Sequence, residues 1–145
     1  MPQRTHQIVT KLCALLLLFV AFSASAGDLL ICVSGLQDSD AELYVALVPA
    51  EQKDWQPALR ELRGKGEQLR LPDVPPGQYA IQLFQDTDGD GKLALSPRGI
   101  PREPVAFSGN PSLFTGKPSP RKSRFEHGEE DTQLELKLHN PRNKP

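Results

Sequence analysis

Three aspartates at alternate positions form the group of residues in this sequence whose types and spacing suit chemistry. The pattern is D-x-D-x-D-G, through Asp86, Asp88 and Asp90. Carboxylates at this spacing converge on one point only where the backbone turns sharply, which Gly91 permits, and the Lys92 carbonyl can add a further oxygen. Hard oxygen ligands of this kind suit Ca²⁺. The alternative is an acidic turn without metal, because Asp and Gly also favour ordinary turns.

The acidic segment differs from an EF-hand loop. The twelfth position counted from Asp86 is Pro97 instead of a bidentate Glu, and the alternating segment 79–84 precedes it in place of an amphipathic helix. The pattern therefore predicts a strand-to-loop calcium site. Its carboxylates fill only part of the shell of 6–8 oxygens, so we expect a dissociation constant on the order of 10⁻⁴–10⁻³ M.

Sequence signals for an enzyme are weak. Beyond residue 26 the histidines are His127 and His139, and the sequence has no G-x-S-x-G, no H-E-x-x-H and no phosphate-binding Gly loop. Carboxylates of a single turn are poorly placed to face each other across a glycosidic bond. We expect a non-enzymatic binding or structural module without a catalytic residue, and a hydrolase is the less favoured alternative.

Charge is balanced overall and uneven locally. The formal net charge of −1 excludes a generally basic nucleic-acid-binding protein. The segment 96–124 nevertheless holds one acid, Glu103, against six bases: Arg98, Arg102, Lys117, Arg121, Lys122 and Arg124. This excess favours, as a second hypothesis, an envelope protein that binds polyanions such as lipopolysaccharide or an anionic glycan. A solvated loop is the simpler explanation, since four acids follow between 126 and 131.

The N-terminus has the layout of a signal peptide. Two bases precede the apolar run 12–22, which is too short to span a bilayer, and the small residues of 23–26 follow it. We expect cleavage after Ala26, a periplasmic or extracellular chain with no remaining transmembrane helix, and a partner in the envelope. Cys32 is then the single cysteine, and we expect it to be buried, with an intermolecular disulfide as the alternative.

Hydrophobic periodicity predicts mainly strands. Alternating or apolar runs suggest strands at 28–34, 42–48, 68–71, 79–84 and 131–139, with the first two joined as a hairpin. In the last of these, Leu134, Leu136 and Leu138 should face inward. Trp55, Leu59 and Leu62 stand at helical spacing.

That spacing predicts a short helix or irregular crossover within 51–63, with Trp55 in the core. The segment 96–124 contains six prolines and should form a long irregular loop. The whole pattern predicts an all-β fold, an antiparallel β-sandwich of about seven strands. It would occupy 27–140 as one domain, ahead of a frayed tail at 141–145.

Several motifs in the chain are similar to those of a bacterial family. The family pattern is P-P-G-x-Y-A, then H-D-x-N-x-N-G-x-x-D, G-I-P-x-E-x-x-x-F-S and G-x-P-x-F-x-x-A-x-F. The matching stretches are Pro75 to Ala80, Asp86 to Gly91, Gly99 to Glu103 with Phe107-Ser108, and Gly116 to Pro118 with Phe125. The chain thus resembles the domain-of-unknown-function family DUF 2141, and its strand entry also resembles prealbumin-like and carboxypeptidase-regulatory-like sandwiches. The resemblance implies a secreted or periplasmic β-sandwich with no established activity; a transthyretin-like hydrolase is the enzymatic alternative.

Four positions depart from the family pattern. Gln85 stands in place of the His, Ala94 in place of the last Asp of the acidic loop, and Arg121 and Arg124 interrupt the stretch before Phe125. If the turn at 99–101 folds back, Glu103 can supply the carboxylate that position 94 lacks. The expected metal ligands are therefore Asp86, Asp88, Asp90, Lys92 and Glu103.

Overall fold

Period-two alternation defines the strands that form the core. In the computed structural model, which describes residues 25–141, β1 (Gly27–Ser34) buries Leu29, Ile31 and Val33 and turns the residues between them outward. β2 (Glu42–Pro49) buries Leu43, Val45 and Leu47 in the same way. Alternating side chains lie on opposite faces of a strand, so each strand offers one apolar face to a common core.

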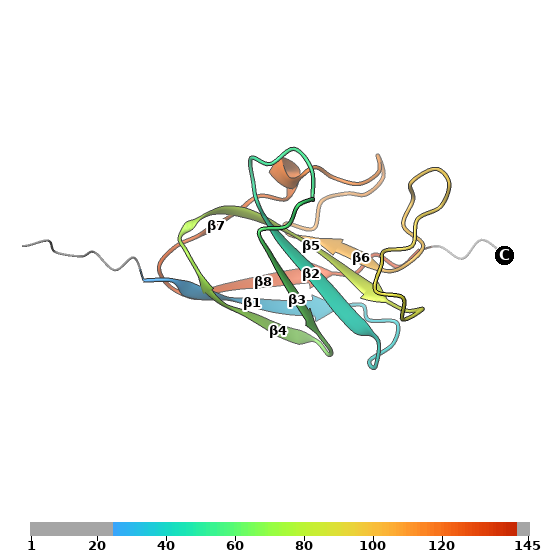
Figure 1. Ribbon diagram of the computed structural model, residues 1–145, viewed down its shortest axis with the longest axis horizontal. Coiled ribbons are helices and arrows are strands. Elements are labelled where there is room, and N and C mark those ends of the chain that lie inside the picture. The colour runs from blue at the N-terminus through green and yellow to red at the C-terminus, as the bar shows by residue number, and fades with distance from the viewer. Residues whose placement is uncertain (1–24, 142–145) are drawn as a thin grey trace, which may run out of the picture.

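Two sheets pack face to face around that core (Figure 1). The remaining elements are β3 (Arg60–Gly64), β4 (Gln68–Val74), β5 (Gly77–Asp86), β6 (Val105–Phe107), the 3₁₀ turn η1 (Pro120–Ser123), β7 (Phe125–His127) and β8 (Thr132–Lys137). One sheet has the order β4-β1-β8, and the other β3-β2-β5-β6, with β7 also paired to β5. The predicted β-sandwich is confirmed, with eight strands among the described residues. One pair, β1 with β8, is parallel, while the others are antiparallel.

The predicted hairpin of the first two strands is wrong. β1 pairs with β4 and β8, whereas β2 pairs with β3 and β5 in the opposite sheet. The polar segment 35–41 thus crosses from one sheet to the other. The alternation of both strands shows that each has one buried face, and this requirement is met equally well from either side of the core.

Of the two alternatives predicted within 51–63, the short helix is wrong, and the irregular crossover is confirmed for 51–59. Residues 51–59 are irregular, and β3 follows, with Leu62 paired to Val45 of β2. Leu59 is 54% exposed, so the helical spacing of the apolar residues here is a coincidence. Trp55 is buried as expected: its indole N–H donates to the Pro118 carbonyl at 2.8 Å, and its ring packs on Phe107.

The last strand contributes to the core as expected. Leu136 and Leu138 are buried and Leu134 is partly buried, which confirms the predicted inward face. The prediction for Cys32 is wrong, because this side chain is only half-buried. Since Leu29, Ile31 and Val33 point to the core, the alternation of β1 turns Cys32 to the outer side.

The Pro-rich segment 96–124 is mostly irregular and contains only β6 and η1 as regular elements. Residues 1–24 of the predicted signal peptide and 142–145 of the predicted tail lie outside the described residues. Within 25–141 no helix has the length and apolar character needed to cross a bilayer.

Candidate metal site

The acidic loop is held at its two ends by neighbouring strands. Asp86 is the last residue of β5, and Glu103 stands two residues before β6. β5 and β6 are antiparallel partners, with Phe84 opposite Val105. The 18-residue connection 87–104 must therefore leave and return at the same place, and this brings Glu103 beside the start of the loop.

Three carboxylates meet there. Oxygens of Asp86, Asp88 and Glu103 all lie within 4.8 Å of one another. Asp86 and Glu103 are only 5% and 3% exposed, while Asp88 is exposed. Buried carboxylates are uncommon unless they are paired, hydrogen-bonded or bound to a metal. Three of the five predicted ligands, Asp86, Asp88 and Glu103, thus converge, and the turn at 99–101 does fold back.

Asp86 organises the loop through both of its oxygens. Oδ1 accepts a hydrogen bond of 2.9 Å from the Gly89 N–H, and Oδ2 accepts one of 2.8 Å from the Gly91 N–H. Gly91 has φ of 75°, and a Cβ there would lie 3.2 Å from the Tyr44 hydroxyl. Both the backbone conformation and the nearby tyrosine therefore favour glycine at this position.

Glu103 joins the beginning and the end of the loop. Its Oε1 accepts from the Thr87 N–H at 2.9 Å, and its Oε2 accepts from the Ala94 N–H at 3.0 Å. The Thr87 hydroxyl also donates to Oε1, at 3.3 Å. An ionised carboxylate offers about four acceptor positions, so about one remains on Glu103 and about two on Asp86 after these bonds. Both groups can hold the loop together and still ligate a cation.

Asp90 and Lys92 lie outside this group of three. Oδ1 of Asp90 accepts from the Lys92 N–H at 2.8 Å, while Oδ1 of Asp88 accepts from the Asp90 N–H at 3.1 Å. The observed contact of Lys92 is made by its N–H, so its carbonyl stays a predicted ligand, as does the Asp90 carboxylate.

The electrostatics of the group disfavour the ionised form of Asp88. The Asp90 backbone N–H lowers the pKa of Asp88, but desolvation, a hydrogen bond with Asp86 and the negative charges of Glu103 and Asp90 outweigh it. The net effect raises the pKa of Asp88 above its usual value of 3.8. A cation placed among these carboxylates would remove the repulsion.

A second acidic segment lies beside the loop and was missed as part of the site. Asp38, Asp40 and Glu42 line a hollow of about 470 Å³ together with Asp86 and Asp88. Gln85, which is fully buried, holds this segment in place: its Oε1 accepts from the Gln37 N–H at 2.9 Å, and its amide donates to the Asp38 carbonyl. The density of acids in 38–42 was a signal, although a turn explains it equally well. Gln85, which stands in place of the His of the pattern described above, therefore serves to position this segment.

Comparison with known families identifies the relatives of this sandwich. The family model described as "Uncharacterized protein conserved in bacteria (DUF2141)" matches residues 31–135. The chain belongs to this family. The DUF2141 match includes the whole acidic loop, Glu103 and the basic segment up to Arg124. Neither the curated proteins nor the solved structures include a match to the chain.

Proposed function

We propose that this DUF2141 protein is an exported, non-enzymatic binding or structural module of the periplasm or cell surface, whose acidic loop binds Ca²⁺ weakly. The observation that carries the proposal is the position of Glu103. A buried carboxylate from the far end of the β5–β6 connection lies within 4.8 Å of Asp86 and Asp88. Position 94 supplies no carboxylate, and Glu103 offers one beside the same loop.

The number of available ligands supports a weak site. Asp86, Asp88 and Glu103 offer three side chains, and Ca²⁺ takes 6–8 oxygens, so water must complete the shell unless Asp90 or the Lys92 carbonyl turns inward. We expect a dissociation constant on the order of 10⁻⁴–10⁻³ M, which is the range of extracellular calcium modules. Such a site stabilises a folded domain where calcium is millimolar.

The surroundings of the histidine support a binding role over a hydrolytic one. His127 is buried, and its ring nitrogens lie 2.7 Å from the Thr132 hydroxyl and 2.8 Å from the Val74 carbonyl. Both nitrogens are thus engaged within the corner formed by β4, β7 and β8, and neither is directed to Glu103 or the Asp loop. A hydrolase would need these groups around one substrate.

Calcium binding is tested by calorimetry and thermal unfolding of the wild type, Asp88→Ala and Ala94→Asp, each with about 1 mM Ca²⁺ and with chelator. We expect calcium to stabilise the wild type by about 1 kcal/mol, Asp88→Ala to lose this gain, and Ala94→Asp to bind more tightly. Glu129→Ala removes an acid from the β7–β8 turn and serves as the control, with an unchanged response. If each of these proteins melts at the same temperature with calcium as with chelator, the loop is only a turn.

Export is tested on the chain expressed with its own N-terminus. Mass spectrometry of the envelope fraction should give a mature protein that begins at Gly27. An intact Met1 in the cytosolic fraction would overturn the predicted localisation.

A further inference from the structure

Phe114 is the most exposed large apolar side chain among the described residues. It lies in the loop 109–119 between β6 and η1 and is 97% exposed. The residue before it, Leu113, is partly buried and packs on the cluster that contains Trp55 and Phe107. The loop is therefore anchored beside Phe114, while the phenyl ring itself stands in water. An exposed aromatic on an anchored loop points to an interaction surface.

A second loop adds apolar side chains on the same side. Leu95 and Ile100, from the β5–β6 connection, are 51% and 61% exposed. Ile100 and Leu113 line one hollow of about 1010 Å³, so the two loops are neighbours. In Figure 1 the tips of both loops, coloured yellow to orange, lie at the upper right, and η1 lies along the same upper side of the molecule.

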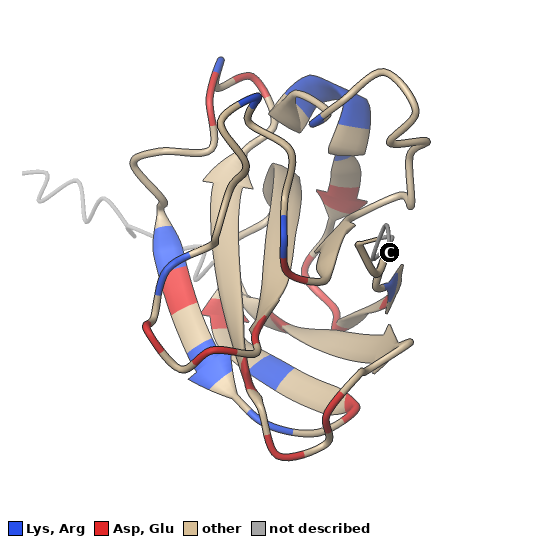
Figure 2. Cartoon of the chain, turned by 90° about the vertical axis from the view of Figure 1, so that its right-hand side faces the viewer, with Lys and Arg blue, Asp and Glu red and all other residues tan. Residues whose placement is uncertain are grey.

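The same loops and η1 carry the six bases of the segment 96–124. All six are exposed, whereas Glu103 is buried and bonded to the acidic loop. Among the described residues the ion pairs involve only one of them, Arg121 with Glu51. Figure 2 shows blue along η1 at the top, where a neighbouring loop carries both blue and red, and mostly red on the loops at the lower end. We call this surface the basic end: Leu95, Arg98, Ile100, Arg102, Phe114, Lys117, Arg121, Lys122 and Arg124.

We propose that the basic end docks onto an anionic lipid bilayer, with Phe114 inserted at the level of the acyl chains. Exposed apolar side chains surrounded by bases are the features by which peripheral proteins bind such a surface. A soluble polyanion would pair with the bases and leave Phe114 in water, whereas a bilayer accommodates both. The basic end includes none of the predicted metal ligands, so the proposal does not depend on calcium binding.

The first test is co-sedimentation of residues 27–145, which contain every described strand, with vesicles of phosphatidylglycerol and phosphatidylcholine. We expect binding to anionic vesicles at about 0.05 M salt, little binding to pure phosphatidylcholine, and loss at about 0.5 M salt, where charges are screened within a few ångströms. Phe114→Ser should weaken binding about tenfold, and Phe114→Leu should retain most of it. The double variant Arg98→Gln/Arg102→Gln should weaken it at least about tenfold, while Lys65→Gln, in the β3–β4 turn, should not.

The second test reports insertion directly. In Phe114→Trp the new indole is exposed in solution, and its emission should shift to the blue when anionic vesicles are added. The native Trp55 is buried and supplies a constant background. A chelator should leave the shift unchanged, because the acidic loop takes no part in it.

Several outcomes would overturn the proposal. One is the absence of vesicle binding at low salt. Another is vesicle binding by Phe114→Trp with no change in its emission, which would mean that the bases act alone. Binding to dextran sulfate without binding to vesicles would identify a soluble polyanion as the ligand. A dimer that Phe114→Ser dissociates would assign the basic end to a second copy of the chain.

Discussion

The backbone N–H of Ala94 donates a hydrogen bond of 3.0 Å to Oε2 of Glu103. Ala94 stands where the DUF2141 pattern described above has its last loop aspartate. In this chain the carboxylate comes from Glu103, and the loop supplies a backbone donor in return. The position of the acidic loop therefore depends on a residue nine positions further along the chain.

Glu103→Gln should destabilise the protein by about 1–3 kcal/mol even without calcium. A glutamine presents an NH₂ group to either the Thr87 or the Ala94 N–H, so one partly buried donor loses its acceptor. Urea denaturation with chelator present measures the loss. Glu126→Gln, an exposed change on β7, is the control and should be nearly neutral. If the two variants unfold at the same urea concentration, Glu103 does not hold the loop.

The effect of Asp88→Asn on the melting temperature should change sign when calcium is added. The raised pKa of Asp88 means that its ionised form is disfavoured in the folded state. Removing the charge should raise the melting temperature in chelator at neutral pH, and this gain should fade as the pH falls and wild-type Asp88 becomes protonated. With millimolar calcium the same variant should melt below the wild type. A variant that melts lower under both conditions would contradict this account of the repulsion.

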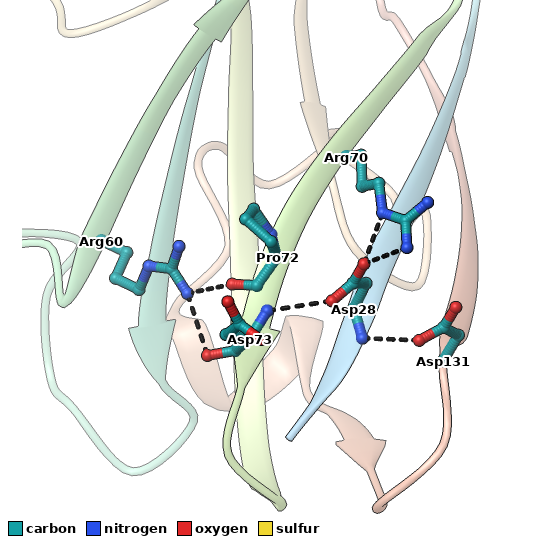
Figure 3. A network of polar contacts seen from close by, with 6 residues as sticks. All are labelled: Asp28, Arg60, Arg70, Pro72, Asp73 and Asp131. Atoms are coloured by element: carbon teal, nitrogen blue, oxygen red, sulfur yellow. Dashed lines mark hydrogen bonds and ion pairs between the residues drawn. The ribbon is translucent and has the colours of Figure 1, made fainter. Parts of the chain in front are cut away.

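Asp28 should contribute a pH-dependent part of the stability (Figure 3). The backbone N–H of Asp73, at 3.0 Å, and the guanidinium of Arg70 lower the pKa of Asp28 below its usual value of 3.8. The contribution is then complete above about pH 4 and is lost as the pH falls through the lower folded-state value.

Asp28→Asn should accordingly melt below the wild type at neutral pH, and the gap should close as the pH falls below the usual carboxyl pKa of 3.8. Arg70→Gln removes the partner of the same ion pair and should show a smaller gap with the same pH dependence. Differential scanning calorimetry from strongly acidic to neutral pH measures both variants. A gap for Asp28→Asn that persists unchanged at the lowest pH would exclude a titrating carboxylate as its cause.

Asn110 should protect the outer edge of β8. Its amide donates to the Glu135 carbonyl at 2.8 Å, and its Oδ1 accepts from the Lys137 N–H at 2.9 Å. Because Asn110 has φ of 45°, Asn110→Gly removes both bonds and tolerates the backbone conformation. We expect a loss of about 1–2 kcal/mol and faster hydrogen exchange at the Lys137 amide. Unchanged exchange there would show that the edge is protected by other means.

The strands that could be predicted are those whose apolar residues recur at every second position. In β1, β2, β8 and the first part of β4 these residues face the core. β5 is buried on both faces, yet its apolar residues at 79, 81 and 83 still follow the period of a strand. β3 was missed because it is a five-residue edge strand with the sequence RELRG, whose apolar residue Leu62 fits a helical spacing equally well. The neighbours of a strand were also beyond prediction, because alternation defines which face is buried and says nothing about the partner.

In the candidate site, too, the local geometry could be predicted from the sequence and the tertiary contacts could not. The spacing of Asp86 and Asp88 follows from local sequence, so a convergent pair could be expected there. The approach of Glu103 depends on the pairing of β5 with β6, and the position of Asp38 depends on the buried amide of Gln85. Tertiary contacts of this kind leave no local pattern in the chain.

The parallel pairing of β1 with β8 has a consequence for how the chain folds. β1 lies in the middle of its sheet, and its register joins Leu29 to Thr132 near the other end of the sequence. The cost of closing so large a loop must be met before the contact stabilises anything, and such high contact order slows folding. The smaller sheet is complete only when the last strand has been synthesised, so a nascent chain lacking β8 leaves one edge of its central strand unpaired.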